Sequence, residues 1–191
     1  MAGFMNRIMR ASKLDKGLYE EVERDTTAMG QAMGVVVLSS IAAGIGHYSI
    51  GGFSGLVLGA VGAIIGWFVW AYVTYLIGTK LLPEPQTQSN HGELLRTIGF
   101  SSSPGLLRVF GVIPGLYPAV FGITGIWMLI AMIIAVRQAL DYRSTVRSIA
   151  VVFIGWILYV VVFGILFVLF KKPVSSGAVE AVFTAASACI G

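Results

Sequence analysis

Charged residues are scarce in this sequence. Asp, Glu, Lys and Arg make up only 12% of the 191 residues, and hydrophobic residues make up 57%, whereas a soluble domain usually carries about 25% charged residues. Lipid tolerates few ionised groups, so the shortage indicates an integral membrane protein. The basic residues do not alternate with aromatic ones, which argues against a nucleic-acid partner.

Residues that usually carry chemistry are also few. The single cysteine, Cys189, excludes an internal disulfide. The two histidines, His47 and His91, fall on opposite sides of the membrane in the topology predicted below, so they cannot share a metal ion. The predicted spans contain no carboxylate, which is the usual proton-relay group of membrane pumps. We therefore expect no catalytic set, no metal, no cofactor and no enzymatic activity.

Long apolar runs are present instead, and most approach or exceed the roughly 20 residues that cross a bilayer as a helix. They predict an all-α polytopic membrane bundle with five transmembrane helices, the third of them short and bent. The predicted spans are residues 29–50, 53–79, 94–113, 116–136 and 149–170. They form a membrane domain over 28–171, between a polar head, 1–27, and a tail, 172–191.

The head carries one apolar stripe. Leu14, Leu18 and Val22 recur every four residues among charged side chains, which is typical of one amphipathic helix. Such a helix could lie on the membrane surface or dock on a partner. It could equally be a short solvated helix that caps the underside of the bundle.

The third predicted span is the unusual one. Residues 100–118 read FSSSPGLLRVFGVIPGLYP, with three serines before Pro104. Proline removes a backbone donor and bends or breaks a helix, and such a break survives at membrane depth when neighbouring helices or serines satisfy the freed groups. We therefore predict a bent span surrounded by protein. A re-entrant hairpin is the alternative.

The distribution of basic residues favours a crossing. With five spans, ten of the 13 lysines and arginines lie on the side of the head, two lie opposite, and Arg108 lies within the third span. Basic residues accumulate in cytoplasmic connectors, so the N-terminus is predicted to be cytoplasmic and the tail non-cytoplasmic. Without the third crossing, the connector with three arginines would move outside and the bias would weaken.

Glycines spaced by four predict close helix packing, because small residues on one face let backbones approach. Such a face would serve either self-association or packing within the bundle. The candidate helix-packing residues are Gly30, Gly34, Gly51, Gly55, Gly59, Gly62 and Gly66.

Several polar positions are candidate lipid or ligand contacts. Arg108 would contact a ligand or a lipid phosphate, or its long stem would reach the outer interface. Arg143 and Arg147 are four residues apart, so one helix face could present both to anionic headgroups, or they could act only as a topology signal. Arg137 and Asp141 have the same spacing and could pair. Ser102 and Pro104 complete the candidates, at the predicted break.

Three stretches resemble a known family. They are LYEEVERDTTAMGQA at 18–32, LLRTIGFSSSPGLLRVFGVIPG at 94–115 and AVRQALDY at 135–142. The chain resembles the Yip-domain family, the Ypt/Rab-interacting membrane proteins, especially its short prokaryotic members. The resemblance implies five spans, a cytoplasmic N-terminus and no enzymatic activity. The head lacks the Tyr-Gly-Pro type motif of eukaryotic members, so no Rab-binding role is carried over, and a prokaryotic cytoplasmic membrane is the expected location.

Two functions remain open from the sequence. The first is a non-enzymatic scaffold, interaction or bilayer-shaping protein, whose partners would be membrane lipids and a membrane protein or a second copy of the chain. The alternative is a small transporter or channel subunit that uses the broken third span, because interrupted helices often line substrate sites.

Overall fold

The computed structural model describes residues 3–46 and 48–170. Side chains at 48–52, 54–56, 58, 59 and 163–170 are also outside the description. The predicted tail, with Cys189, therefore lies outside the described residues. The chain divides into two units after Gly155. Residues 156–170 continue the last helix in the second unit.

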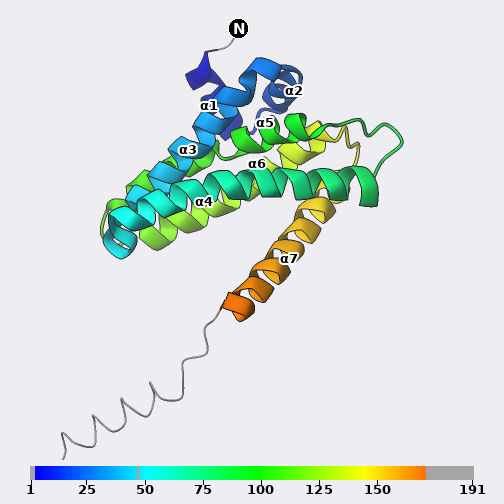
Figure 1. The fold of residues 1–191 in the computed structure, drawn as a ribbon. Helices are drawn as coiled ribbons and strands as arrows, with labels where there is room; N and C mark the ends of the chain where they lie inside the picture. The colour runs from blue at the N-terminus through cyan, green and yellow to red at the C-terminus, as the bar shows by residue number, and fades with distance from the viewer. Residues whose placement is uncertain (1–2, 47, 171–191) are drawn as a thin grey trace, which may run out of the picture. The chain divides into compact units, whose positions relative to one another are not determined.

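The described residues form helices and connecting segments without strands, which confirms the all-helical prediction (Figure 1). The elements are α1 (Phe4–Ser12), α2 (Lys16–Arg24), a short 3₁₀ turn η1 (Thr26–Ala28), α3 (Met29–Gly46), α4 (Tyr48–Leu76), a π-helical end η2 (Ile77–Leu81), α5 (His91–Ser101), a 3₁₀ helix η3 (Ser103–Val112), α6 (Tyr117–Ala139) and α7 (Thr145–Phe170).

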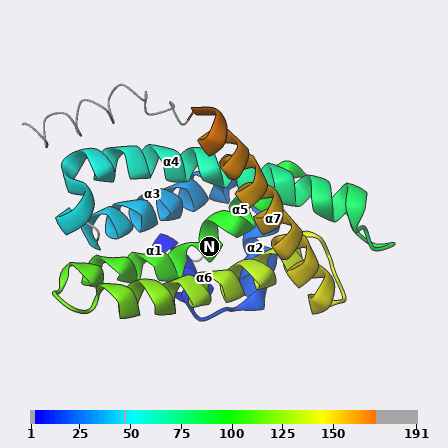
Figure 2. The same ribbon diagram turned by 90° about the horizontal axis from the view of Figure 1, so that it is seen from below.

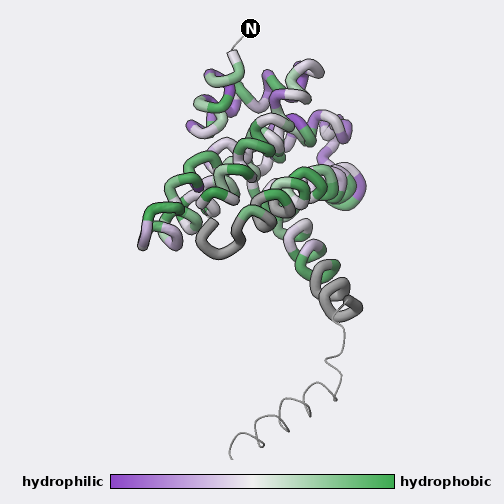
Figure 3. Tube along the Cα trace, turned by 60° about the vertical axis from the view of Figure 1, so that its left-hand side comes forward, coloured by the Kyte–Doolittle hydropathy of each residue, from purple (hydrophilic) through white to green (hydrophobic). Residues whose placement is uncertain are grey.

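Within residues 3–46 and 48–170, four helical stretches are long and apolar enough to cross a membrane. They are Thr26–Gly46, Ala60–Leu81, Tyr117–Ala139 and Thr145–Val162. These stretches confirm a multi-pass membrane protein. The predicted third span has a different form, since residues 91–112 are divided between α5 and η3 and form no single helix of spanning length. Hydrophilic residues gather at the N-terminal end of the molecule, over the head, whereas the long helices are largely hydrophobic (Figure 3).

The centre of the first unit is formed by α3, α6 and the α5–η3 segment, which packs against both (Figure 2). The α5–η3 segment runs parallel to α3. Gly99 lies against Ala32, Gly105 against Ser39, and the Arg108 carbonyl against Gly46. The following helix, α6, returns along the same path. The end of α3, the beginning of α4 and the η3–α6 connection therefore lie at one end of the bundle, and the segment 82–90 lies at the other.

The head consists of two helices, so the prediction of one continuous stripe was wrong. α1 ends at Ser12 and α2 begins at Lys16, and Leu14 lies in the turn between them with a φ of 61°. The α2 part of the stripe is correct, because Leu18 and Val22 are fully buried. They face α5 and α6. Of the predicted alternatives, the helix that caps the bundle describes the observed packing.

Candidate functional site

The break between α5 and η3 occurs at Ser102, two residues before the proline. Pro104 lacks the N–H that the Phe100 carbonyl would accept in a continuous α-helix. The Ser103 hydroxyl donates to that carbonyl instead, over 2.7 Å, and the Ser101 hydroxyl donates to the Ile98 carbonyl, also over 2.7 Å. Serines thus satisfy groups that the break frees, as the sequence predicts. Ser102 caps α5 through its backbone, and its N–H donates to the Gly99 carbonyl.

After the break, η3 presents one close-packed face to its neighbours. A 3₁₀ helix has three residues per turn, so Gly105, Arg108 and Gly111 lie one above another. A methyl group on Gly105 would overlap the Ser39 side chain, and one on Gly111 would come within 2.8 Å of the Phe121 ring. Pro104 and Gly105 are buried. The residues that follow the break therefore pack closely against α3 and α6.

Arg108 lies against α6. Its Nε donates to the Thr124 hydroxyl over 3.3 Å, and its guanidinium carbon lies 5.2 Å from the centre of the Phe121 ring. Cations are attracted to the face of an aromatic ring at such distances. The Thr124 hydroxyl in turn donates to the Val120 carbonyl. The side chain is thus held by protein groups at the end of the bundle where α3 and η3 terminate.

The arginines of the α6–α7 connector are arranged differently from the prediction. α7 begins at Thr145, so Arg143 precedes it and does not share a helix face with Arg147. Arg147 donates to the Pro83 carbonyl over 2.8 Å and lies 3.5 Å from the Glu84 carboxylate. The Glu84 carboxylate also accepts from the Arg143 N–H over 3.1 Å. These contacts join the α6–α7 connector to the segment that follows η2.

The suggested pair of Arg137 and Asp141 does not form. Because α6 ends at Ala139, Asp141 lies beyond the helix, and its φ of 53° directs the chain into a turn. Arg137 donates to the carbonyls of Tyr142 and Arg143 instead, over 3.2 and 3.0 Å. It thereby fixes the connector onto the end of α6.

Of the predicted helix-packing glycines, the four whose surroundings the structure describes are not at its closest helix approaches. A methyl group on Gly30, Gly62 or Gly66 would meet no atom within 4 Å, and one on Gly34 would make an ordinary contact with Phe4. Gly51, Gly55 and Gly59 belong to α4, but their surroundings lie outside the description. Among the glycines whose surroundings are described, those at the closest approaches are Gly46, Gly78, Gly99, Gly105 and Gly111.

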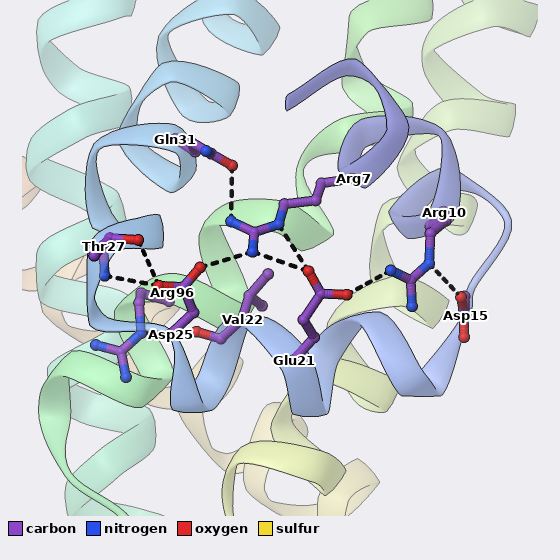
Figure 4. A network of polar contacts seen from close by, with 9 residues as sticks. All are labelled: Arg7, Arg10, Asp15, Glu21, Val22, Asp25, Thr27, Gln31 and Arg96. Atoms are coloured by element: carbon purple, nitrogen blue, oxygen red, sulfur yellow. Dashed lines mark hydrogen bonds and ion pairs between the residues drawn. The ribbon is translucent and has the colours of Figure 1, made fainter. Parts of the chain in front are cut away.

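An ion network fixes the head as one unit (Figure 4). The Arg7 side chain is only 4% exposed and bridges Glu21 and Asp25, at 2.9 and 2.7 Å. It also donates to the Gln31 side chain on α3, over 3.0 Å. The Arg10 guanidinium holds the pKa of Glu21 below its ordinary value, with a further hydrogen bond from Arg7. α1, α2 and α3 are therefore joined by charges that partly neutralise one another.

Arg96 attaches the head to the third segment. This buried side chain of α5 donates from Nε to the Val22 carbonyl over 2.8 Å, and it also donates to the Glu23 carbonyl. The carbonyls of a final helical turn have no partner within the helix. Arg96 thus caps α2 from outside, and a cation at a helix C-terminus is favourable. From the sequence, Arg96 is only one of the ten basic residues that predict the orientation of the chain in the membrane.

A pocket of about 320 Å³ lies between α2 and the end of α6, and we call it the α2–α6 pocket. Its lining residues are Glu20, Glu23, Arg24, Arg137, Gln138, Asp141, Tyr142 and Arg143. Burial, and then repulsion from Asp141, Glu93 and Glu20, raises the pKa of Glu23 to about 7. Burial and repulsion from Glu93 likewise raise the pKa of Asp141. No sequence motif marks these residues as neighbours, because α2 and the end of α6 are far apart in the sequence.

The remaining residues supply no sign of a metal site. No group of three or more His, Cys, Asp or Glu side chains within 3–46 and 48–170 is arranged to hold a metal ion. Many of the described charged groups instead bind one another or backbone carbonyls, or line the α2–α6 pocket.

Comparison with known proteins identifies the family. A search of curated proteins and of solved structures found no match. A family model described as the Yip1 domain matches residues 20–170. The match begins within α2 and ends with α7, so it contains the broken third segment and the four long apolar stretches. The chain therefore belongs to the Yip1 domain family.

Proposed function

We propose that this protein is a non-enzymatic interaction platform of the membrane, which scaffolds a complex or shapes the bilayer through the surface of its head. The observation that carries the proposal is the attachment of α1 and α2 to the bundle. Arg7 joins both helices to α3, and Arg96 caps α2. A surface that is ordered before binding avoids the entropic cost of ordering during association.

The proposal includes five crossings, with α5 and η3 together forming the third. An α-helix rises about 1.5 Å per residue and a 3₁₀ helix about 2.0 Å. The 11 residues of α5 and the 10 of η3 therefore cover roughly 36 Å, against about 30 Å for the hydrocarbon core. The parallel course of this segment along α3 supports a crossing rather than a re-entrant hairpin.

The head is proposed to lie in the cytoplasm of a prokaryotic cell. The concentration of basic residues on that side of the five-span arrangement supports this orientation. Cysteine labelling tests it with the full chain in intact cells, after permeabilisation of any outer membrane. A membrane-impermeant maleimide should label native Cys189 without lysis. It should label a Lys13→Cys, Cys189→Ser variant only after lysis. Labelling of both sites only after lysis would contradict five crossings.

The scaffold role is tested by purification in native lipid and identification of proteins that accompany the chain. Arg7→Met should loosen the head and reduce recovery of a partner, whereas Lys13→Met removes an exposed charge from the same region and should retain it. A second copy of the chain counts as a partner and is detected by two tags. A solitary monomer that also leaves membrane shape unchanged would overturn the proposal.

The alternative, a transporter that uses the broken segment, is less favoured. At the break, Pro104 and Gly105 are buried, and Gly105 packs on Ser39 and Met128. Arg108, which would be expected to face a substrate path, contacts Thr124 and Phe121. A substrate site needs space and accessible polar groups, and the packing around the break does not favour this use.

A further inference from the structure

The α2–α6 pocket carries opposite charges in equal number. Its lining includes three carboxylates and three guanidinium groups. Two of the carboxylates, Glu23 and Asp141, form no side-chain hydrogen bond or ion pair with any residue that the structure describes. Like charges brought together in a partly buried site repel each other, so a cation placed between these two carboxylates would remove an unfavourable interaction.

Two of the guanidinium groups are also available. Arg24 of α2 and Arg143 of the connector line the pocket, and neither side chain forms a hydrogen bond or ion pair with an acid among the described residues. The charge of Arg24 offsets only part of the effects that raise the pKa values of Glu23 and Asp141. Arg137 is held by two backbone carbonyls and supports the wall. Guanidinium groups bind phosphate through several N–H donors. The pocket therefore offers binding groups for an anion beside those for a cation.

We propose that the α2–α6 pocket binds a phosphoethanolamine group. Glu23 and Asp141 would accept hydrogen bonds from the primary ammonium, and Arg24 and Arg143 would bind the phosphate. A zwitterion suits this lining because it pairs both kinds of charge and leaves the pocket neutral. A purely anionic ligand would leave the two carboxylates without a counter-charge and would bring a further like charge close to them, which is unfavourable.

The chemistry of the cation is part of the proposal. A primary ammonium has three N–H donors, whereas the quaternary ammonium of choline has none. Carboxylates favour the ammonium with N–H donors, whereas choline is usually recognised by a cage of several aromatic rings, and Tyr142 is the single aromatic residue of this lining. The group could come from the headgroup of phosphatidylethanolamine or from a soluble phosphoethanolamine compound. This site does not depend on the scaffold role, since a ligand could bind whether or not the head contacts a protein.

The test uses the full chain, purified in detergent and examined by native mass spectrometry. The probes are dioleoyl phosphatidylethanolamine, its choline and glycerol counterparts, and soluble O-phosphoethanolamine. We expect the ethanolamine lipid to bind at least tenfold more tightly than the choline or glycerol lipid. Binding of the soluble compound as well would show that the headgroup suffices, and binding of the lipid alone would assign the membrane as the source. Either result supports the proposal.

Variants locate the site. Glu23→Gln and Asp141→Asn should each weaken binding at least tenfold and remove the preference for ethanolamine over choline. Arg24→Gln should weaken binding of the ethanolamine lipid but keep its preference over the choline lipid. Lys16 is an exposed cation of the same helix, so Lys16→Gln is the matched control. Because Glu23 must be ionised to bind a cation, affinity in the wild type should rise several-fold between pH 6 and pH 8.

Three results would overturn this assignment. They are equal binding of ethanolamine and choline lipids, tighter binding of the glycerol lipid, and wild-type affinity in all the pocket variants. Circular dichroism and the unfolding midpoint of each variant separate loss of the site from loss of the fold. Arg24→Gln alters an exposed side chain, so it remains informative if a carboxylate variant unfolds.

Discussion

The hydroxyl of Ser103 donates to the carbonyl of Phe100 over 2.7 Å, in place of the N–H that Pro104 lacks. An unsatisfied carbonyl buried away from water costs roughly 1–3 kcal/mol. We therefore expect Ser103→Ala to lower stability by about that amount. Unfolding in a defined detergent, followed by circular dichroism, measures the change.

A double-variant cycle isolates this relationship. Pro104→Ala restores a backbone donor at residue 104, so Ser103→Ala should cost less in its presence than in the wild type. Equal costs in both backgrounds would show that the serine hydroxyl does not compensate for the proline.

The second prediction compares glycines. Gly105→Ala and Gly111→Ala place methyl groups against Ser39 and Phe121, and overpacking a close-packed interior costs typically 1–3 kcal/mol. Gly62→Ala, in α4, meets no atom within 4 Å and should be neutral or slightly stabilising, because alanine favours helices. Thermal midpoints of the three variants decide the matter. A loss at Gly62 as large as that at Gly105 would point instead to a helix partner outside this chain.

The third prediction concerns the head. Arg7→Met removes the cation that Glu21 and Asp25 share, and the loss of one partner of a buried pair commonly costs 3–5 kcal/mol. Because both carboxylates are partly exposed, we expect about 2 kcal/mol here. Hydrogen exchange should accelerate in α1 and α2 while α3 and α6 stay protected. Unchanged exchange in α2 would mean that apolar burial alone holds the head.

The fourth prediction is a pH dependence of head docking. The pKa of Glu23, about 7, lies above its ordinary value, so the folded state favours the protonated form. The contribution of Glu23 to the free energy of unfolding is fully present below its unfolded pKa, near 4.5, and is lost as pH rises through 7. After screening we expect about 1 kcal/mol from this half-buried group. In the wild type, protection of the α2 amides against hydrogen exchange should decrease between pH 5 and pH 8. Glu23→Gln should abolish this decrease.

The same head should also loosen in acid. The pKa values of Asp15, Glu21 and Asp25 lie below their ordinary values, through bonds from Arg10, Arg10 and Thr27 respectively. Stability from these groups is present above their unfolded pKa values and disappears as pH falls through the lowered ones. Protection of the α2 amides, which is the slowing of their exchange relative to the intrinsic rate at each pH, should therefore be greatest between about pH 4.5 and pH 7. A monotonic profile in the wild type would contradict one of the two assignments.

The fifth prediction concerns hydroxyls without a described partner. The Thr74 and Ser148 hydroxyls are buried and make no hydrogen bond to any described residue. Replacing such a group by an apolar one of similar shape removes a desolvation cost of roughly 1 kcal/mol. Thr74→Val and Ser148→Ala should thus raise the unfolding midpoint, opposite in sign to Ser103→Ala. A lowered midpoint would indicate that these hydroxyls are hydrogen-bonded after all.

Apolar runs and prolines could be predicted from the sequence, because a bilayer and a missing N–H impose constraints that act locally. They identified the long helices and the break before Pro104. The turn in the head was missed because Leu14 continues an apolar spacing of four, although its φ of 61° interrupts the helix. Asp15 was the available signal. It is a good N-cap residue, and its carboxylate accepts from the Gly17 N–H at the start of α2.

The close-packed glycines were missed for a geometric reason. A search for glycines four apart assumes α-helices, whereas Gly105 and Gly111 are six apart and share a face only in a 3₁₀ helix. The α2–α6 pocket could not be predicted, because neighbours such as Glu23 and Asp141 are brought together only by tertiary packing. The same applies to Arg96, whose partners are carbonyls of a distant helix.

The parallel course of α3 and the α5–η3 segment has a consequence for biosynthesis. The surface of α3 that receives Gly99, Gly105 and Arg108 is made long before those residues leave the ribosome. α3 and α4 must therefore enter the membrane while this surface of α3 contacts lipid or the insertion machinery, until the α5–η3 segment replaces them. The proline-broken segment can then be inserted against α3 as a template, so a truncation just before residue 91 should leave a hairpin that depends on chaperones.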